Sequence, residues 1–579
     1  MHTLREGDLP LDHLYRWEAE QPDRVFLTQP LDRGKVREWT WGQAGAEIRR
    51  MAAYLRSTGM EPGARVAILS KNCAWWVMAD IACWMAGYVS VPIYPSLKPE
   101  SVRQILEHSG ALLCFVGATD DRECPALGIP EGVGKVYFPT AGAGGHPGWD
   151  EAASSVQPIT GTPSRNAGEL ATIIYTSGTT GLPKGVMHSF GGFRASSAAL
   201  AATLELKPYQ RVLSYLPLAH IVERAGLEMM SVALGWHVFF SEGLETFLVD
   251  LHRARPTIFL SVPRLLLKFQ QGVFAKLPQH KLERLLRIPV LNLVIRRKVL
   301  RGLGLDTVRQ AACGAAPLPT EILMWYRGLG LELVEGYGMS ETMITHLPRP
   351  GKLRPGYVGM GIEGVEQKLG ENDELLVRSP MNMMGYYRDP DATRAAFTVD
   401  GYFRTGDVVR LEPDGQVKII GRVKEQFKTS KGKYVAPAPI ESRLMEHPGI
   451  DACCLMGAGQ ASPVAIVMLS DDTRARCCDP RERAAFEQSL ATRMQEINAG
   501  LDPHERLSLI VIVDGPWNVS NGLMTPTMKI RRAALEDRYG ELIGRWRGQG
   551  VPVIWETIPG VGPQIYDAAT PERPGRQRD

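Results

Sequence analysis

The fold is decided by the stretch VAILSKNCAWWVMADIACWMAGYVSVPIYPSLKPESVRQILEHSGALLCFV, residues 66–116. Apolar runs of strand length alternate here with segments whose apolar residues recur at helical spacing. The pattern predicts strands at 66–69, 89–93 and 111–116, separated by helices at 75–86 and 100–108. Strands that alternate with helices form parallel sheets, which bind ligands at the carboxyl ends of their strands. We therefore predict an α/β fold.

The most apolar part of this stretch is not expected to cross a membrane. Asp80, Gly87 and Pro92 interrupt residues 73–94, and the pattern changes there from helical to strand-like. Two buried elements fit these interruptions better than one membrane span. Further along, residues 118–166 are rich in glycine, proline and small residues, so we expect an irregular connection.

The composition is typical of a globular protein with several domains. The chain has 579 residues, 44% apolar and 22% charged, which excludes a disordered or fibrous chain and a lone small module. Its 66 Lys and Arg balance 63 Asp and Glu, so a nucleic-acid partner is not expected. The nine cysteines have neither a disulfide framework nor zinc-ligand spacing. No secretory signal is recognisable at the start, so we expect a cytoplasmic protein.

The chain divides into a large N-terminal part and a smaller C-terminal part. Near Gly421 a strand-like run leads into the charged sequence RVKEQFK, residues 422–428, and the elements that follow are shorter and mixed. We expect an N-terminal domain at 1–421, a C-terminal α+β domain at 422–545 and a tail at 546–579. Short polar joints permit hinge motion, so the C-terminal domain is expected to be mobile.

A strand followed by hydroxyls and glycines indicates a phosphate site. Residues 171–185 read ATIIYTSGTTGLPKG. Backbone N–H groups of such a loop can converge on phosphate oxygens, and Lys184 adds a positive charge. The P-loop of nucleotide hydrolases would require glycine where this chain has Pro183 or Val186, which excludes that alternative. A flexible polar turn is the remaining simpler interpretation.

Four further motifs follow in order along the chain. They are GYGMSET at 336–342, GYFRTGD at 401–407, GRVK at 421–424 and TPTMK at 525–529. With them the chain resembles the adenylate-forming superfamily of acyl-CoA synthetases, peptide-synthetase adenylation domains and firefly-type luciferases. The resemblance covers nearly the whole chain. It implies a large N-terminal adenylate-forming domain with layered sheets and helices, followed by the smaller mobile domain.

Two segments are similar to those of long-chain fatty acyl-CoA synthetases in particular. They are LSYLPLAHIVER at 213–224 and FKTSKGKYVAP at 427–437. Two positions depart from the usual pattern: Gly421 stands where the long-chain enzymes often have Asp, and Ser340 replaces Thr. Neither change removes a chemical group that the reaction needs.

The resemblance implies a nucleotide site. Tyr337 would stack on adenine, Ser340 would contact the α-phosphate, and Asp407 and Arg422 would bind the ribose. Small residues at 313–317 would form the adenine wall. The implied ATP- and AMP-binding residues are Thr176, Ser177, Gly178, Thr179, Thr180, Gly181, Lys184, Gly314, Ala315, Ala316, Gly336, Tyr337, Gly338, Ser340, Asp407 and Arg422.

The resemblance also implies catalytic roles. Glu341 and Thr180 would hold Mg²⁺, His220 would stand beside the acyl carboxylate, and Lys529 would pair with the carboxylate and the α-phosphate. Taken alone, His220 would be read as a core histidine and Glu341 as a solvated loop acid.

Three more positions are implied for domain motion and the second substrate. Lys424 would be the hinge, and Lys428 and Gly432 would line the passage for CoA. A charged linker is the simpler interpretation of this segment.

These features predict a two-step ligase. A long-chain fatty acid would react with ATP to give acyl-AMP and pyrophosphate, and CoA would then form the thioester and release AMP. ATP, Mg²⁺ and CoA are therefore the expected cofactors and co-substrates. Two alternatives stay open: an acyl-AMP ligase that delivers its product to a carrier protein, and a non-catalytic lipid-binding protein on the same scaffold.

One further segment suggests contact with a lipid surface. Residues 276–301 contain many Lys and Arg residues and a single acidic residue, Glu283, and Pro289 divides them into two short amphipathic pieces. We expect weak, salt-sensitive contact with anionic membranes, such as the inner membrane face. An ordinary packed helical region with a solvated basic face is the alternative. A homodimer also stays open.

Overall fold

The computed structural model describes residues 4–5, 7–31, 34–119, 125–141, 147–176, 183–243, 245–525 and 528–556. Its central sheet has the strand order β19-β8-β7-β4-β3-β5-β6. The neighbours from β7 to β6 pair in parallel, whereas β8 and β19 pair antiparallel. The strands are β3 Arg65–Leu69, β4 Val89–Ile93, β5 Ala111–Val116, β6 Gly134–Tyr137, β7 Leu170–Thr176, β8 Lys184–Ser189 and β19 Gly385–Tyr386. The predicted parallel α/β architecture is confirmed.

Helices cover this sheet. α3 (Ala74–Ala86), α4 (Pro99–Ser109) and α6 (Phe190–Thr203) pack against its strands, and α2 (Trp41–Ser57) packs on α3. Every residue of α3 is buried, and Gly87 ends the helix at φ 100°. Glycine adopts that conformation without penalty, so β4 can begin two residues later. Residues 73–94 thus form two buried elements, as predicted. None of the helices described combines the length and apolarity needed to cross a bilayer.

Residues 118–166 differ from the irregular connection that we expected. They contain β6, the 3₁₀ turn η2 (Pro125–Gly128) and α5 (Trp149–Ser154). Trp149 packs against Phe115 and Phe138, and its indole N–H donates to Glu47 at 3.0 Å. Burial of this aromatic side chain gives a polar, glycine-rich stretch enough apolar contact to order a helix.

Two smaller sheets complete the N-terminal core. One has the order β2-β1-β10-β9 and the other β11-β12-β13, with the latter strands parallel. Their strands are β1 Val25–Pro30, β2 Val36–Thr40, β9 Arg211–Ser214, β10 His237–Phe240, β11 Ile258–Ser261, β12 Gln310–Cys313 and β13 Leu333–Glu335. α1 (Pro10–Glu20) packs on α8 (Met229–Leu234), where the Trp17 indole donates to the Val232 carbonyl at 2.7 Å.

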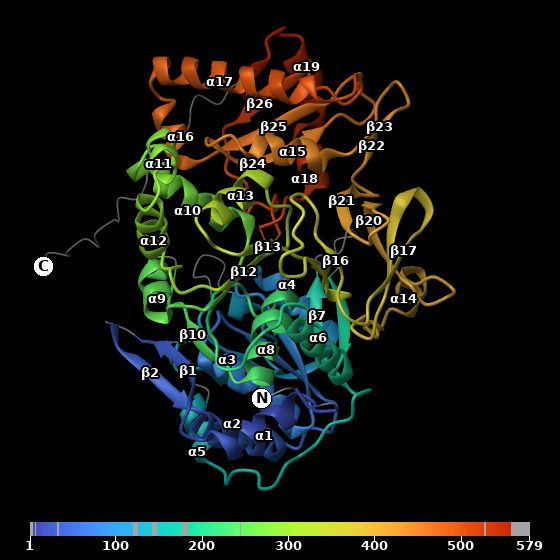
Figure 1. Ribbon diagram of the computed structural model, residues 1–579. Helices are drawn as coiled ribbons and strands as arrows, with labels where there is room; N and C mark the ends of the chain where they lie inside the picture. Colours follow the sequence, from blue (N-terminus) through green and yellow to red (C-terminus); the bar gives the residue numbers. More distant parts are fainter. Residues whose placement is uncertain are drawn as a thin grey trace, which may run out of the picture.

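A column of helices forms one side of the molecule (Figure 1). It consists of α9 (Phe247–Ala254), α10 (Pro263–Lys276), α11 (Gln279–Leu286) and α12 (Leu291–Gly302). Pro289 lies between α11 and α12, as predicted from the sequence. α13 (Thr320–Gly328) packs on α10.

Antiparallel sheets follow along the chain. One has the order β14-β15-β16 and the next β17-β18-β20-β21. Their elements are β14 Tyr337–Met339, β15 Met343–Leu347, β16 Met360–Gly361, β17 Glu366–Leu369, β18 Glu374–Arg378, α14 Pro390–Ala396, β20 Phe403–Leu411 and β21 Val417–Arg422. β21 leads into the short hairpin of β22 (Phe427–Lys428) and β23 (Tyr434–Val435).

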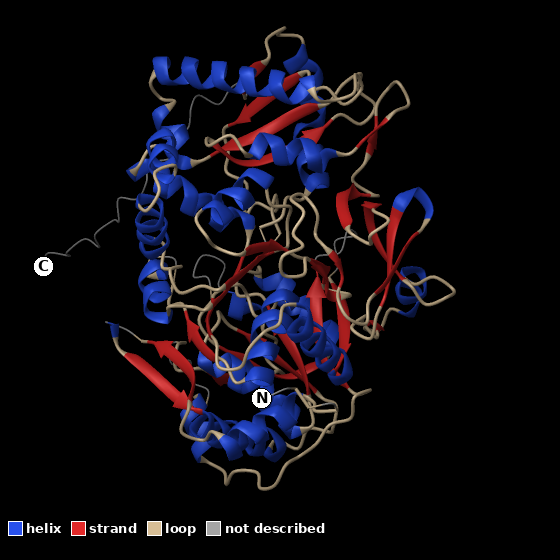
Figure 2. Cartoon of the chain, viewed as in Figure 1, coloured by secondary structure: helices blue, strands red, loops and turns tan. Residues whose placement is uncertain are grey.

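The C-terminal part has its own sheet, β24-β25-β26-β27, covered by helices (Figure 2). Its elements are α15 Pro437–Met445, β24 Ile450–Met456, β25 Val464–Leu469, α16 Asp471–Arg476, α17 Pro480–Ala499, β26 Leu509–Val513, α18 Arg532–Tyr539, α19 Ile543–Arg547 and β27 Val553–Trp555. Separate apolar clusters pack on the two faces of this sheet. The α+β character is as predicted, but β27 pairs with β26, so the sheet reaches into the range that we assigned to a tail.

Polar contacts join the C-terminal part to α10. The Arg264 guanidinium lies 2.6 Å from an Asp451 carboxylate oxygen, and the Gln271 amide donates to the Pro448 carbonyl at 3.2 Å. Few residues make these contacts, which is consistent with an interface that can open. The domain boundary at residue 421 stays a prediction.

Candidate functional site

The first side-chain cluster joins β14 to β20 and β21. Asp407 and Arg422 are direct partners in the β20–β21 pairing, and Arg422 Nε lies 2.7 Å from Asp407 Oδ1. The Tyr337 hydroxyl donates to Asp407 Oδ2 at 2.5 Å. Residues from three sequence motifs are thus brought together.

This cluster can still bind a ligand. Burial raises the pKa of Asp407, and the Arg422 guanidinium opposes that shift. Enclosure and the neighbouring Asp407 charge raise the pKa of Tyr337. Arg422 leaves 41% of its side chain exposed, and a carboxylate has more lone pairs than two partners occupy. Asp407 and Arg422 can therefore accept and donate hydrogen bonds to a polar ligand.

A second cluster contains Lys184 and Glu341. The Tyr386 hydroxyl donates to Glu341 Oε1 at 3.0 Å, and Lys184 Nζ lies 4.8 Å from the centre of the Tyr386 ring. A cation over an aromatic face is attracted to it, so Tyr386 holds both predicted residues in place. Tyr386 was not among the residues predicted from the sequence. Its signal was only the aromatic pair Tyr386-Tyr387 after a glycine.

The glycines of the 336–342 motif allow close contacts with neighbouring residues. A Cβ on Gly338 would lie 2.0 Å from the Met343 carbonyl oxygen, and one on Gly336 would lie 2.7 Å from Leu347. The β14–β15 hairpin therefore needs glycine at both positions. Its next residue, Ser340, is fixed through its carbonyl, which lies 2.6 Å from His188 Nε2.

The predicted adenine wall is a turn at the carboxyl end of β12. A Cβ on Gly314 would lie 3.3 Å from the Gly336 carbonyl oxygen, so this turn packs closely against the first residue of the 336–342 motif. Ala315 adopts a φ of 69°, and Ala316 is exposed. The small residues leave backbone groups accessible at the end of a parallel strand, which is where α/β folds bind ligands.

Lys529 is presented by a tight turn of the C-terminal part. Met524 and Ile530 bridge as antiparallel partners, and the Lys529 N–H donates to Thr525 Oγ1 at 3.1 Å. Met528 has a φ of 60°, which is uncommon outside glycine and indicates a constrained turn. The constraint fixes the direction in which the chain presents Lys529.

The Lys529 ammonium lies among the charges of the N-terminal clusters. Loss of hydration and the Arg422 charge lower the pKa of Lys529, while Asp407 and Glu341 oppose the shift. Lys529 nevertheless keeps exposed surface. Its position brings residues of both parts of the chain to one site.

His220 lies within range of the Lys529 charge. Its Nδ1 accepts from the Val222 backbone N–H at 3.2 Å, which caps the one-turn helix α7 (Ile221–Glu223). Burial lowers the pKa of His220 to about 4, and the Lys529 charge adds to the effect. The ring is therefore neutral at neutral pH. Because Nδ1 is the acceptor, the proton is on Nε2, which can donate to a carboxylate.

An apolar pocket includes Gly226, in the helical segment that follows His220. It lies between the π-helix η3 (Arg224–Glu228), α6, α8, β11 to β13 and the chain after β15. Its walls are mainly aliphatic, and they include Leu200, Gly226, Met230, Leu260, Val334 and Ile344. A Cβ on Gly226 would lie 3.2 Å from Leu260 and 3.4 Å from Ile344, so glycine keeps this wall open. Such a pocket can hold a hydrocarbon chain.

A fully buried charge cluster joins Arg224 and Glu228 of η3 to Asp80 of α3. Arg224 Nη2 is 2.5 Å from Asp80 Oδ2, and Arg224 Nη1 donates to Thr172 Oγ1 at 2.8 Å. Glu228 Oε2 lies 3.4 Å from Arg224 Nε, and the side chains of Arg224, Asp80 and Glu228 are all 0% exposed. Burial raises the pKa of Glu228, and the Asp80 charge raises it further. Burial also raises the pKa of Asp80, but the Arg224 guanidinium opposes that shift. The neutral form is thus favoured at Glu228, and the Arg224–Asp80 contact is the short ion pair of the cluster.

Five residues of the predicted phosphate loop fall outside the described part of the chain. They are Ser177, Gly178, Thr179, Thr180 and Gly181, whereas Thr176 ends β7.

Three predicted residues lie around the β22–β23 hairpin. Lys424 is exposed in the turn after β21, and Lys428 and Gly432 are exposed in the hairpin itself. Gly432 has a φ of 76°, and a Cβ there would lie 3.8 Å from Lys428. None of the cleft contacts described above involves these residues.

Comparisons with families identify the scaffold. Residues 14–387 match the family "AMP-binding enzyme", and residues 424–546 match the family "AMP-binding enzyme C-terminal domain". The chain is similar to the long-chain-fatty-acid–CoA ligase FadD15 of Mycobacterium tuberculosis, with 30% identity over 93% of this chain and 96% of that protein. It is also similar to the peroxisomal long chain acyl-CoA synthetase 6 of Arabidopsis thaliana, with 30% identity over 88% of this chain and 81% of that protein.

Solved structures share the fold at lower identity. The adenylation domain of carboxylic acid reductase from Segniliparus rugosus, bound to AMP and a carboxylic acid, has a TM-score of 0.78 and 21% identity over 94% of this chain and 95% of its own. ATP-bound MatB from Rhodopseudomonas palustris has a TM-score of 0.71 and 22% identity over 92% of this chain and 99% of its own.

Proposed function

Because the chain belongs to the AMP-binding enzymes, a family of adenylate-forming ligases, we propose that it is a long-chain fatty acid–CoA ligase. The observation that carries this proposal is the aliphatic pocket lined by Gly226, in the helical segment that follows His220. A carboxylate at His220 would have its hydrocarbon chain beside Gly226. The long-chain relatives, similar over almost the whole chain, support the same substrate class.

In the first half-reaction, a carboxylate oxygen attacks the α-phosphorus of ATP. The bond from that phosphorus to the bridging oxygen breaks, and pyrophosphate leaves with its electrons. Lys529 would neutralise charge on the carboxylate and the α-phosphate, and His220 Nε2–H would orient the carboxylate. The Ser340 hydroxyl would contact the α-phosphate in the same step.

The nucleotide would lie across the two clusters of the cleft. Asp407 and Arg422 would bind the ribose hydroxyls, and Tyr337 would stack on adenine beside the Gly314–Ala316 turn. Lys184, held over Tyr386, would contact the outer phosphates together with the loop 176–181.

Mg²⁺ fits this site through Glu341. Within the part of the chain that the structure describes, no three His, Cys, Asp or Glu side chains are grouped so as to hold a metal by themselves. Mg²⁺ commonly takes one or two carboxylates together with substrate phosphates, so Glu341, with the predicted Thr180, suits it. When bound, Mg²⁺ would neutralise phosphate charge. Tyr386 would orient Glu341 toward it.

In the second half-reaction, the CoA thiolate attacks the acyl carbon, and AMP leaves. For this step the C-terminal part would turn about Lys424, withdraw Lys529 and bring Lys428 and Gly432 to the CoA passage. Such a turn would break the Arg264–Asp451 ion pair, which is partly exposed and therefore weak. One cleft would then serve two reactions in two domain arrangements.

The test is a fatty-acid panel with separate readouts for the two steps. Pyrophosphate release with palmitate and ATP reports adenylation, and AMP release that requires CoA reports thioester formation. If pyrophosphate is released but only a carrier-protein thiol, and not CoA, accepts the acyl group, then a carrier protein would replace CoA in the proposal. No pyrophosphate with any chain length would reject the ligase.

A further inference from the structure

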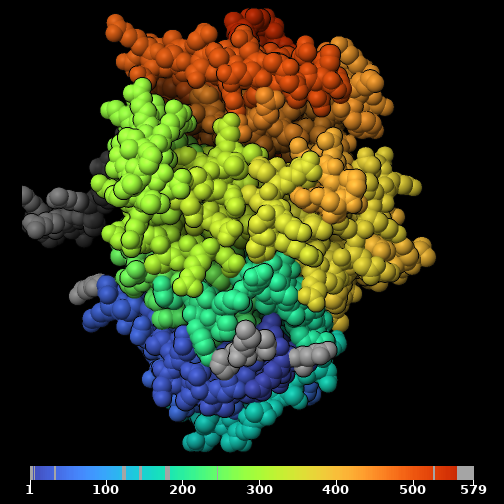
Figure 3. All heavy atoms as spheres, viewed as in Figure 1, coloured from blue at the N-terminus to red at the C-terminus, as the bar shows by residue number. Residues whose placement is uncertain are grey.

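A basic surface lies on the helical column, and the proposed reaction makes no use of it. It comprises residues 276–301, which we call the basic flank: part of α10, all of α11 and most of α12 (Figure 3, light green). Its basic residues are Lys276, Lys281, Arg284, Arg287, Arg296, Arg297, Lys298 and Arg301, against the single acid Glu283.

Most of this charge is not neutralised. Arg301 lies 3.6 Å from Asp306. The other seven basic side chains make no ion pair with any residue that the structure describes, and six of them are exposed. The excess positive charge of the basic flank therefore faces solvent, although the whole chain has a net charge of only +3.

Exposed aliphatic side chains lie within the same surface. At the junction of α11 and α12, Ile288 is 48% exposed, Val290 76%, Leu293 66% and Val294 58%. Val290 has a φ of 68°, a conformation that glycine or asparagine adopts more easily than a β-branched residue. The sequence thus keeps an apolar side chain at the most exposed point of the turn.

The opposite side of the basic flank is anchored to the N-terminal domain. Leu282 is buried, and Val299 and Leu300 pack against the apolar core beneath. His252 of α9 places Nε2 3.0 Å from the Arg301 carbonyl oxygen, which ties the end of α12 to α9. The basic and apolar side chains are therefore displayed on a packed platform.

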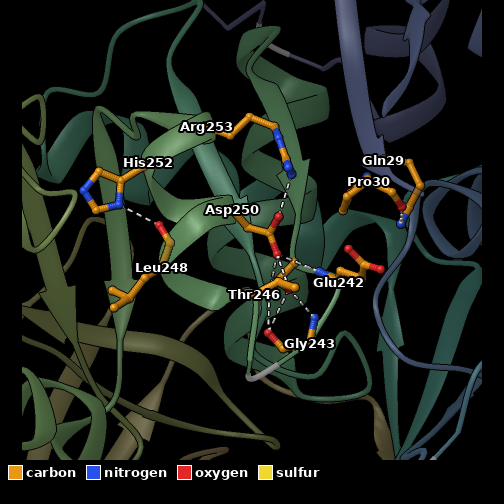
Figure 4. Close-up of polar contacts among 10 residues, drawn as sticks. Gln29, Pro30, Glu242, Gly243, Thr246, Leu248, Asp250, His252 and Arg253 are labelled. Carbon is orange, nitrogen blue, oxygen red and sulfur yellow. Dashed lines mark hydrogen bonds and ion pairs between the residues drawn. The ribbon is translucent and has the colours of Figure 1, made fainter. Parts of the chain in front are cut away.

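α9 itself is fixed at its start by one buried carboxylate (Figure 4). Asp250 accepts from the Glu242 backbone N–H at 2.9 Å and from Thr246 Oγ1 at 2.8 Å, and it pairs with Arg253 at 2.5 Å. His252 Nδ1 lies 2.6 Å from the Leu248 carbonyl oxygen of the same helix. These contacts fix α9, the helix that contacts the end of α12.

We propose that the basic flank docks reversibly on a bilayer that contains anionic phospholipids. The charge attracts anionic headgroups, and Ile288, Val290, Leu293 and Val294 can enter the boundary between headgroups and acyl chains. A soluble polyanion would match the charge but would leave the aliphatic cluster exposed. Long-chain fatty acids partition into bilayers, so docking would bring the enzyme to its substrate; this last benefit rests on the proposed function, whereas docking itself does not.

Vesicle co-sedimentation tests the proposal. The full chain is mixed with vesicles of phosphatidylcholine alone, or of phosphatidylcholine and phosphatidylglycerol in equal parts, at low and high salt. Three variants are compared with the unaltered chain. The first reverses exposed charges of the basic flank, Arg287→Glu, Arg297→Glu and Lys298→Glu. The second reverses the same number of exposed charges elsewhere, Arg481→Glu, Arg506→Glu and Arg545→Glu. The third removes apolar contact, Val290→Ser and Leu293→Ser.

We expect binding to the anionic vesicles at low salt and its loss at high salt. Reversal in the basic flank should weaken binding at least about tenfold, while the matched reversal changes it little. The serine variant should weaken vesicle binding but not binding to heparin, which offers charge alone. Absence of binding at low salt, equal effects of the two reversals, or no effect of the serine changes would each overturn the proposal. Thermal melting and fatty-acid-dependent pyrophosphate release confirm that each variant is folded.

Discussion

Two charge clusters of this chain use similar side chains for different purposes. One joins Asp407 to Tyr337 and Arg422, within range of the Lys529 charge, and the other joins Arg224 to Asp80 and Glu228. Both perturb the pKa of their carboxyl groups through burial. Arg422 leaves 41% of its side chain exposed, whereas Arg224 exposes 0%. Perturbed ionisation therefore does not identify a ligand site by itself; access for a ligand must accompany it.

The inaccessible cluster has a structural role next to the pocket. The rings of Trp76, Trp84 and Phe193 surround the Arg224 guanidinium, with its central carbon between 5.4 and 5.7 Å from their centres. Arg224 begins η3, and Gly226 of the same π-helix lines the pocket. The cluster thus fixes one wall of the proposed acyl site without contact to a substrate.

The largest effect should come from breaking the inaccessible cluster. Arg224→Met leaves the Asp80 carboxylate buried without its partner, so we expect a loss of about 3–5 kcal/mol in the free energy of unfolding. Urea denaturation measures this. Glu228→Gln is the matched control, because burial raises the pKa of the Glu228 carboxyl and so favours its neutral form, which the amide resembles. A control as unstable as the Arg224 variant would contradict the proton assignment.

Lys529→Ala should break the accessible cluster with little loss of stability. Removing a group that stabilises charge in the transition state should slow acyl-adenylate formation at least about 10²-fold. Thioester formation from supplied acyl-AMP and CoA should persist, because that step uses another domain arrangement. Single-turnover assays of each step provide the measurement. Equal losses in both steps would reject the role given to Lys529.

Gly226→Val tests the wall that the inaccessible cluster positions. The added methyl groups would meet Leu260 and Ile344, so kcat/KM for a long-chain acid should fall by about 10- to 200-fold relative to a short-chain acid. Gly272→Val is the control, because a Cβ there meets no atom within 4 Å. If kcat/KM fell equally for acids of all chain lengths, Gly226 would not line the site for the acyl chain.

Tyr386→Phe should have the smallest effect. It removes one hydrogen bond to Glu341, which is worth about 0.5–1.5 kcal/mol and corresponds to a few-fold to tenfold slower adenylation. The Mg²⁺ concentration for half-maximal rate should rise, which loss of packing alone would not cause. Tyr387→Phe is the neighbouring control, since its hydroxyl makes only a long 3.4 Å hydrogen bond to the Ser109 carbonyl. An unchanged Mg²⁺ dependence would remove Tyr386 from the metal site.

Much of the fold could be predicted because its signals are local. The strands at 89–93 and 111–116 match β4 and β5, since their apolar runs and glycine ends lie within a few residues. β6 and α5 could not be predicted in this way, because Trp149 becomes buried only against residues from distant segments. β27 could not be predicted for the same reason, because it pairs with β26, which is distant in the sequence.

The candidate site shows the same division. Motifs predicted Asp407, Arg422 and Tyr337, and the structure brings all three together. Tyr386 was missed because its link from Lys184 to Glu341 depends on the pairing of β19 with β8, which no local pattern reports. The roles of Lys424, Lys428 and Gly432 stay predictions, because they concern a second domain arrangement.

The π-helix η3 has a consequence for insertions and deletions. A π turn closes its hydrogen bonds one residue later than an α turn, so η3 amounts to an α-helix with one residue added. Removing one residue between Arg224 and Glu228 would let this segment close its hydrogen bonds as an α-helix. The wider turn that presents Gly226 to the pocket would then be lost. The length of this segment, and not only its side chains, is therefore part of the site.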